Sequence, residues 1–467
     1  MIDCYIAFQT QQVALTENNL RTQPLVRNIE FLQDSLVKSG TIKYISQNSE
    51  SEYTLLYTKP TALSFVHFAI ERMVQVAEMT GAVMVYADHF NQSNGVITQA
   101  PVIDYQQGSL RDDFDFGSVL LIDTQALKKV AVDMPDDLQY AALYDMRLRL
   151  SEQGKLVHIN EYLYYDVELD TRKSGEKLFD YVNPKNRAVQ VEMERVCTDY
   201  LKRIGAFVDY RSLKTIDLTD GDFEYEASVV IPCKNRVRTI GDAIKSALNQ
   251  QVRAPYKYNV IVVDDNSTDG TVDVINSFDD DRLVYIAQDP TWHAIGGNWN
   301  MALHHPKCGR FALQLDSDDM YSDNQTVQRF IDKFHEEHCA MVIGTYRITD
   351  FNLNELPPGV IDHREWTAEN GMNNALRING LGAPRGFFTP LMRQINFPTT
   401  KYGEDYAVGL RLCREYKIGR IYEVMYNCRR WDDNSDANVN IEGMNKNNLY
   451  KDRLRTWELQ ARLNLPK

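Results

Sequence analysis

From Ala227 onward, short β-branched runs alternate with helical patterns, and this alternation limits the fold more than any other feature of the sequence. The runs are ASVVIP, YNVIVV, RLVYIA and RFALQL, and each is followed by a turn and an amphipathic stretch. Such a rhythm is typical of parallel βα units. An open parallel sheet binds ligands at the carboxyl ends of its strands. The residues that directly follow these runs are therefore the first candidates for chemistry.

Apolar residues recur at helical spacing after the first and the fourth of these runs. One stripe lies within residues 240–248 and the other within 327–334. Each predicts a helix with a single core-facing side. Strands and helices together predict an α/β domain in which helices flank a mixed, mostly parallel sheet.

Length, charge and cysteine content narrow the class of protein. The chain has 467 residues, so two domains are expected. Its net charge of −14 argues against binding to nucleic acids or to anionic membranes in general. Its seven scattered cysteines contain no CxxC pair, which favours a reducing compartment over a disulfide framework or a zinc site. No stretch reaches the ~18 apolar residues that a transmembrane helix needs. We therefore expect a soluble, cytoplasmic protein without a transmembrane span.

Two polar loops follow the first and second runs and should lie side by side. The first contains Pro232, Asn235 and Arg236, and the second begins with Asp264 and Asp265 in the sequence DDNSTDGT. A carboxylate at a strand end can accept hydrogen bonds from a nucleobase or a ribose hydroxyl. The same residues also fit a capped turn before a helix. Both interpretations stay open on this evidence.

The fourth run ends in an acidic loop. Asp316, Ser317, Asp318 and Asp319 follow the apolar residues FALQL. Three carboxylates in four residues repel one another unless a cation is present, and hard oxygen ligands suit Mg²⁺ or Mn²⁺. Acidic loops are often merely solvated, but the position at a strand end favours a metal site that contacts a diphosphate.

Two further groups complete the candidate site. Glu404 and Asp405 fall in the first turn of a predicted helix, where the helix dipole alone favours acids, and either could act as a general base. Arg429, Arg430 and Trp431 end a strand-like run. The arginines could hold a diphosphate or form surface ion pairs, and the tryptophan offers an apolar face for a sugar or the core.

Taken in order, the segments IPCKNR, VVDDNSTDGT, GGNWN, LDSDD, GED and NCRRW resemble the family-2 glycosyltransferases of GT-A fold, a Rossmann-related architecture. The resemblance covers residues 227 to about 435. It implies that Pro232, Asn235 and Asp264 or Asp265 hold the nucleoside, that Asp316, Asp318 and Asp319 form the metal-binding DxD element, and that Asp405, or otherwise Glu404, is the base. It also implies inversion by direct displacement.

Two segments depart from the family pattern. Asn298-Trp299-Asn300 replaces the usual Ala-Arg-Asn, which puts one donor contact in doubt. Asn427 replaces the glutamine of the QxxRW element, which weakens the analogy with processive synthases. A single-addition enzyme is therefore predicted.

The N-terminal half shows traces of the same pattern. Residues 148–164 align without a gap with 410–426, and seven of the seventeen positions are identical. This register places Ala142 and Leu143 opposite Glu404 and Asp405. A second alignment sets residues 86–89 opposite residues 316–319. The N-terminal segment retains only one of the three acids. We therefore predict a smaller, reduced GT-A-like domain that is catalytically silent. Its run GSLRDDFDFGS is either a sugar-contacting loop or a packed one.

These observations predict four segments and one main function. Residues 1–172 form the reduced domain, 173–225 a connecting helix and linker, 226–440 the catalytic domain, and 441–467 an amphipathic helix that packs on the body or, less favoured, contacts a membrane peripherally. The expected enzyme transfers a hexose or N-acetylhexosamine from a UDP-sugar to a glycan or glycoconjugate hydroxyl, in bacterial polysaccharide assembly. The alternative is a non-catalytic nucleotide- or sugar-binding scaffold. A dehydrogenase is disfavoured because the GxGxxG loop is absent.

Overall fold

The computed structural model describes residues 1–7, 13–93, 95–167, 186–364, 366–431 and 440–465. The chain divides into two compact units. Unit 1 comprises Met1–Gly175, Ala188–Phe207 and Val439–Lys467, and unit 2 comprises Glu176–Arg187 and Val208–Asn438. Helices α6 (Arg187–Ile204) and α14 (Ile441–Leu463), which the sequence suggested as a connector and a terminal helix, therefore lie mainly or wholly in unit 1.

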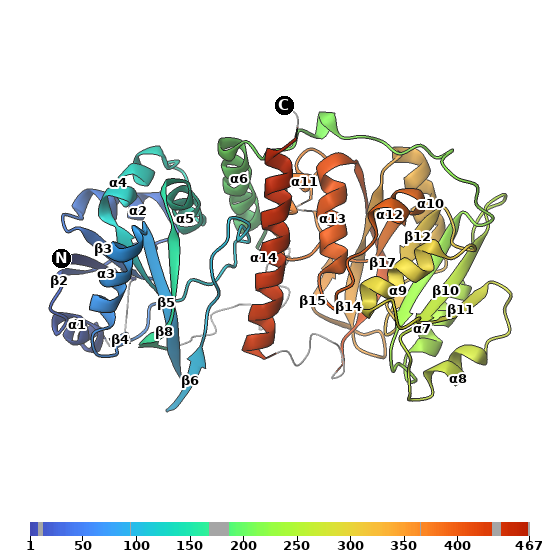
Figure 1. Cartoon of the computed structure of the whole chain (residues 1–467), viewed down its shortest axis with the longest axis horizontal. Helices are drawn as coiled ribbons and strands as arrows, with labels where there is room; N and C mark the ends of the chain where they lie inside the picture. Colours follow the sequence, from blue (N-terminus) through green and yellow to red (C-terminus); the bar gives the residue numbers. More distant parts are fainter. Residues whose placement is uncertain (8–12, 94, 168–185, 365, 432–439, 466–467) are drawn as a thin grey trace. The chain divides into compact units, whose positions relative to one another are not determined.

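Unit 2 is built on a mixed sheet of nine strands (Figure 1). The strand order is β11-β10-β9-β12-β16-β14-β17-β13, and β15 pairs with β14. The strands are β9 (Ala227–Cys233), β10 (Tyr258–Asp264), β11 (Leu283–Ala287), β12 (Phe311–Gln314), β13 (Met320–Tyr321), β14 (Met341–Thr349), β15 (Glu355–Ile361), β16 (Arg385–Phe388) and β17 (Ile418–Arg429).

The four predicted runs are the parallel strands β9, β10, β11 and β12 of this sheet. Every residue of β9 and β10 is buried, which explains why these strands read as continuous apolar runs rather than alternating ones. The predicted helical stripes are confirmed in α7 (Ile240–Leu248) and α10 (Thr326–Glu337). The other helices of unit 2 are α8 (Thr271–Asn276), α9 (Ala294–His304), α11 (Gly371–Asn374), α12 (Thr389–Ile395) and α13 (Glu404–Glu415).

Unit 1 repeats this topology on a smaller scale. Its sheet has the order β2-β1-β3-β7-β5-β8-β4, with β6 paired to β5. The strands are β1 (Ile2–Ile6), β2 (Val26–Phe31), β3 (Tyr53–Tyr57), β4 (Ser64–Phe65), β5 (Met84–Ser93), β6 (Val96–Ala100), β7 (Val119–Asp123) and β8 (Leu156–Asp166). Its helices, besides α6 and α14, are α1 (Val13–Arg21), α2 (Ser39–Asn48), α3 (Ala69–Thr80), α4 (Thr124–Asp133) and α5 (Ala142–Gln153). The reduced GT-A-like domain predicted for the N-terminal half is thereby confirmed.

Strand pairing fixes the correspondence between the two sheets. Leu156 of β8 pairs with Met84 of β5, and Ile418 of β17 pairs with Met341 of β14. The offset between β8 and β17 is 262 residues (418 minus 156), which is also the offset between the first residues of α5 and α13. The alignment of 148–164 with 410–426 is therefore correct, and α5 begins with Ala142 where α13 begins with Glu404.

The second sequence comparison was wrong. Strand β5 corresponds to β14, so residues 86–89 are not the counterpart of Asp316–Asp319. An apolar run that ends in an acid does not reveal which strand of a sheet it forms. The true counterpart of β12 is β3, because each lies between the first strand of its unit and the antiparallel partner β7 or β16. The loop after β3, which begins Thr58-Lys59-Pro60-Thr61, has no acid at all.

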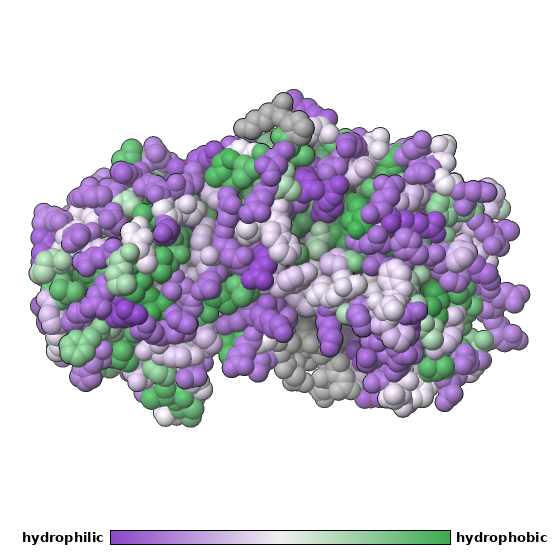
Figure 2. Space-filling view, viewed as in Figure 1, coloured by the Kyte–Doolittle hydropathy of each residue, from purple (hydrophilic) through white to green (hydrophobic). Residues whose placement is uncertain are grey.

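Two remaining expectations concern packing and membranes. The run GSLRDDFDFGS is a packed loop, since Phe114 and Phe116 are each only 7% exposed. No helix in the described part of the chain is long and apolar enough to cross a membrane. Hydrophilic side chains dominate the face shown in Figure 2, with apolar residues scattered among them.

Candidate active site in unit 2

The loops after β9 and β10 lie side by side, as their sequence positions predicted. Asn235 Oδ1 accepts a hydrogen bond from Thr268 N at 2.9 Å, and Asn235 N donates to Ser267 Oγ at 2.7 Å. Asn235 and Asn266 both have positive φ angles, 52° and 53°. Asparagine tolerates this left-handed conformation better than most residues. Pro232 is buried within β9, so it shapes the start of this loop.

The two acids at the end of β10 have different surroundings. Asp264 is 2% exposed and accepts hydrogen bonds from Ser267 N at 3.0 Å and from the Ser267 hydroxyl, so its carboxylate closes a local turn. The Asp265 side chain is 22% exposed and pairs with Lys234 Nζ at 3.0 Å. The side-chain amide of Gln288 lies between Asp265 and Asn298. Asp264 therefore fits the capped-turn interpretation, and Asp265 is the acid that a nucleoside could reach.

The acidic loop after β12 concentrates negative charge in a buried place. Burial and the Asp318 carboxylate raise the pKa of Asp316, although hydrogen bonds from the Gln314 amide at 3.0 and 3.1 Å oppose this rise. Burial and the carboxylates of Asp318 and Asp316 raise the pKa of Asp319 well above its usual range. Buried carboxylates that disfavour one another's ionisation are what a bound cation would relieve.

The three acids differ in what they already contact. Asp319 is buried and accepts a hydrogen bond from Arg429 N at 2.7 Å, which ties this loop to β17. Asp318 Oδ2 accepts from Trp431 Nε1 at 3.2 Å and lies 3.9 Å from Arg236 Nε. Ser317 is buried. Among the described residues, no group of three or more His, Cys, Asp or Glu side chains is arranged to hold a metal ion.

The segment Arg429-Arg430-Trp431 lies against this loop. Arg429 is 1% exposed, and its guanidinium donates to Asp318 O at 2.6 Å and to Asp242 at 2.9 Å, so it is occupied within the fold. Arg430 N donates to Thr349 O at 2.8 Å, and this residue is only partly buried. The ion-pair interpretation therefore fits Arg429 best, and Arg430 is the arginine of the two with more solvent access.

A cation–π cluster surrounds Trp431. The guanidinium carbons of Arg236 and Arg238 lie 5.8 and 5.1 Å from the indole, and Phe351 packs edge-on against it at 5.3 Å. Sequence reasoning missed Arg238 and Phe351. Arg238 is two residues beyond the recognised motif, and nothing in the sequence places Phe351, from the turn after β14, next to Trp431.

The predicted base site lies at the start of α13. Gly403, with φ 76°, precedes the helix, and both acids occupy its first turn. The Asp405 side chain is 27% exposed and pairs with Arg385 Nη1 at 2.7 Å. Glu404 is buried, and burial together with the Asp405 carboxylate raises its pKa to about 8. Glu404 therefore holds its proton near neutral pH, whereas the Asp405 carboxylate has a cationic partner.

A chain of hydrogen bonds joins the acidic loop to the base site. The Gln314 side chain donates to Asp316, and its Oε1 accepts from Arg385 N at 3.2 Å. The Arg385 side chain in turn pairs with Asp405. Gln314 is the last residue of β12 and Arg385 is the first of β16, and neither belongs to a motif that the sequence analysis recognised. These contacts connect the acidic loop with the start of α13, although the two are 86 residues apart in the sequence (405 minus 319).

The glycine pair that opens α9 is explained by close packing behind this site. A Cβ atom at Gly296 would lie 1.9 Å from Pro398 O, and one at Gly297 would lie 2.9 Å from the Trp292 carbonyl carbon. Residues other than glycine would push α9 away from the segment that leads to Glu404. The segment Asn298-Trp299-Asn300 differs from the family pattern. Its Trp299 stacks on Phe397 with ring centroids 5.1 Å apart and is a core residue.

The raised pKa of Glu404 predicts a pH-dependent stability. Between about pH 4.5 and 8 the folded protein keeps a proton that the unfolded chain releases, so wild-type stability should fall as pH rises through this window. Each pKa unit corresponds to about 1.4 kcal/mol, so the loss is of the order of 5 kcal/mol. Glu404→Gln should lose this contribution and so show a shallower fall than wild type, as measured by urea unfolding in EDTA. Glu415→Gln, at the far end of α13, should keep the wild-type slope, because the pKa of Glu415 is lowered. Parallel profiles for wild type and Glu404→Gln would contradict the assignment.

Comparisons with known proteins find glycosyltransferases similar to this chain. The profile of the family described as "Glycosyl transferase family 2" matches residues 228–397. TuaG of Bacillus subtilis, named for teichuronic acid biosynthesis, is 31% identical over 196 residues, which span 40% of this chain and 72% of that protein. WfgD of Escherichia coli, named a UDP-Glc:alpha-D-GlcNAc-diphosphoundecaprenol beta-1,3-glucosyltransferase, is 27% identical over 199 residues, or 42% of this chain and 74% of that protein. The structure of Staphylococcus aureus TarS 1–349 with UDP aligns with a TM-score of 0.39 and 19% identity, covering 50% of this chain and 65% of that one.

The fold of unit 2 and its site define an enzyme of the glycosyltransferase class that uses a nucleotide-sugar donor. The chain belongs to glycosyltransferase family 2.

Proposed function

We propose that unit 2 is an inverting, metal-dependent and non-processive glycosyltransferase. It transfers a hexose or N-acetylhexosamine from a UDP-sugar to a hydroxyl of a glycan or glycoconjugate, in polysaccharide biosynthesis at the cytoplasmic side of the membrane. The observation that carries this proposal is the chain Asp316–Gln314–Arg385–Asp405, because it joins the acidic loop to a partly exposed carboxylate that is paired with an arginine. Metal and base functions need this proximity in one site.

The donor would bind across the ends of β9, β10 and β12. Asp265 is placed to accept hydrogen bonds from the nucleoside, and Asn235 holds the two neighbouring loops together. Arg236, Arg238 and Arg430 provide positive charge for a diphosphate, and Trp431 presents a ring beside them. Arg429 acts through its contacts to the acidic loop rather than by touching the donor.

The acidic loop fits Mn²⁺ or Mg²⁺. Asp316 and Asp318 are the proposed ligands, because the Asp319 carboxylate is buried and bonded to Arg429 N. Two carboxylates suffice for an ion that takes its remaining ligands from substrate phosphates and water, which is how Mg²⁺ commonly binds. The ion, when bound, would stabilise the negative charge of the departing nucleoside diphosphate.

Asp405 is the proposed general base. It is more exposed than Glu404, and its pairing with Arg385 favours the ionised form that can accept a proton from an acceptor hydroxyl. Glu404, with a pKa of about 8, is mostly protonated near neutral pH and cannot accept one as readily. The names of TuaG, a teichuronic acid biosynthesis glycosyltransferase, and of WfgD, which acts on a diphosphoundecaprenol-linked sugar, support an acceptor linked to a polymer or a lipid.

Nucleotide release from a panel of UDP-, GDP- and CMP-sugars tests the proposal without knowledge of the acceptor. We expect slow hydrolysis of a UDP-sugar with Mn²⁺ or Mg²⁺ and none with EDTA. If no donor is hydrolysed and no nucleotide binds in a metal-dependent way, the protein is instead a scaffold that binds sugars or nucleotides.

A further inference from the structure

We propose that unit 1 binds a neutral saccharide in a cleft between the loop after β6 and helices α5 and α6. The cleft has a volume of about 520 Å³ and is lined by Tyr105, Gln107, Ser151, Glu152, Tyr200 and Ile204. This volume lies within the range of small-molecule sites. The inference rests on the proposed function in one respect, because a glycan acceptor gives the saccharide its role.

Hydroxyl groups and aromatic rings line this cleft together. The Tyr105 hydroxyl is buried and has no hydrogen-bond partner within the described ranges. The Ser151 hydroxyl lies near both Tyr105 and Tyr200 and donates its proton to Leu148 O at 2.6 Å. Burial raises the pKa of both Tyr105 and Tyr200, so both phenols stay protonated and can donate. A buried polar atom without a partner calls for an explanation, and a ligand hydroxyl that shares the cleft provides one.

The charge of the cleft selects against ionic ligands. Its one acid, Glu152, pairs with Arg203 of α6 at 2.8 Å, so the lining is close to neutral overall. Gln107 is exposed at the rim and offers both a donor and an acceptor. Tyrosine rings give flat apolar walls with a polar end. Neutral sugars combine many hydroxyls with apolar ring faces. Phosphates lack the apolar faces, and lipids lack the many hydroxyls.

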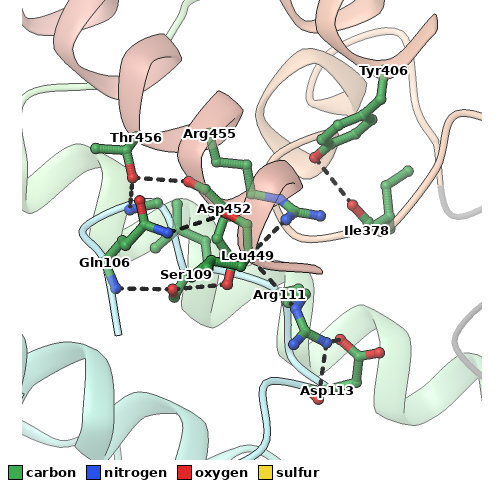
Figure 3. A network of polar contacts seen from close by, with 12 residues as sticks. Gln106, Ser109, Arg111, Asp113, Ile378, Tyr406, Leu449, Asp452, Arg455 and Thr456 are labelled. Atoms are coloured by element: carbon green, nitrogen blue, oxygen red, sulfur yellow. Dashed lines mark hydrogen bonds and ion pairs between the residues drawn. The ribbon is translucent and has the colours of Figure 1, made fainter. Parts of the chain in front are cut away.

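Helix α14 holds the wall that carries Tyr105 and Gln107 in place (Figure 3). Gln106 Nε2 donates to Leu449 O at 3.2 Å, and Gly108 N donates to Thr456 Oγ1 at 2.9 Å. Ser109 Oγ donates to Asp452 Oδ2 at 2.9 Å, and Asp452 also pairs with Arg455 at 2.8 Å. A Cβ atom at Gly108 would lie 2.1 Å from Thr456 N, so the loop touches the helix backbone. The cleft wall is therefore fixed before any ligand binds, which lowers the entropic cost of binding.

Saturation-transfer NMR on the full chain tests this site, with glucose, N-acetylglucosamine, laminaribiose and chitobiose as the probes. We expect binding to at least one probe, and Tyr105→Phe and Gln107→Ala should each weaken it about fivefold, the effect of one lost hydrogen bond. Tyr44→Phe, at an exposed tyrosine outside the cleft, should leave the affinity unchanged. Tyr105→Phe removes a single oxygen, and its thermal unfolding should match wild type.

Two results would overturn the site: no saturation transfer to any probe, or equal affinities for wild type, Tyr105→Phe and Gln107→Ala. Donor hydrolysis is recorded on the same samples, and it should be the same for wild type and all three variants. Failure of hydrolysis in the wild type would count against the proposed function alone, because saccharide binding to unit 1 does not require it.

Discussion

Asp318→Ala should abolish metal-dependent hydrolysis of the nucleotide sugar, a loss of about a thousandfold or more. Burial and the Asp318 carboxylate raise the pKa of Asp316, and a divalent ion bound between the two side chains would offset this effect. Without Asp318, a single proposed ligand remains, and affinity for the ion should collapse. Nucleotide release measured with Mn²⁺, Mg²⁺ and EDTA checks this, and the residual rate of the variant should be the same in all three.

Asp318 also accepts a hydrogen bond from Trp431, so a loss of activity could come from a displaced loop. Trp431→Phe separates the two explanations, because it removes this bond and leaves both carboxylates. It should slow hydrolysis and keep its dependence on metal. Asp332→Ala, which removes an exposed acid paired with Arg253, is the matched control and should behave as wild type. Metal-stimulated hydrolysis that survives in Asp318→Ala would show that the ion binds elsewhere.

The parallel part of unit 2 could be predicted because local sequence and tertiary position agree there. Strands β9 and β10 are apolar throughout because both faces are covered, and their ends carry polar loops because the edge of the sheet meets solvent. Where two parallel strands are neighbours, the loops that follow them lie at the same edge of the sheet and are neighbours too. Asn235 and Thr268 therefore meet as the pattern implied.

Contacts that depend on antiparallel strands could not be predicted. Arg385 reaches Asp405, and its backbone meets Gln314, only because β16 runs between β12 and β14. No spacing rule gives that order. For the same reason, the sequence comparison set the wrong residues of unit 1 opposite Asp316–Asp319. An apolar run does not show its place in the sheet, so β5 could not be distinguished from β3.

The corrected register gives a physical reason why unit 1 should be silent. In the loop after β3, where unit 2 has its acids, Lys59 Nζ pairs with the buried Asp166 carboxylate at 2.7 Å. The ammonium group supplies positive charge there without an external ion. At the start of α5, Ala142 and Leu143 replace the two acids of α13. At the two positions that correspond to the proposed metal and base sites, unit 1 therefore lacks the acids of unit 2, and we expect it to bind rather than to catalyse.

Asp405→Asn should reduce glycosyl transfer about a hundred- to ten-thousandfold while nucleotide affinity stays within a few-fold of wild type. The asparagine keeps the shape of the side chain but cannot accept a proton from the acceptor. Arg385 remains anchored, since its guanidinium also donates to Gly382 O at 2.7 Å. Glu404 cannot substitute near neutral pH, because its buried carboxyl is largely protonated. UDP titration calorimetry and transfer to a defined glycan acceptor measure the two quantities separately.

Glu415→Gln, at the other end of α13, is the control for this experiment and should transfer at the wild-type rate. Full transfer by Asp405→Asn, with loss of transfer in Glu404→Gln, would assign the base to Glu404 instead. In that case the activity of the wild type should rise with pH through about 8, since a base with that pKa becomes competent only as it ionises. With Asp405 as the base, ionised through its pairing with Arg385, no such rise is expected between pH 6 and 8. The pH profile of the wild type therefore distinguishes the two carboxylates independently of either substitution.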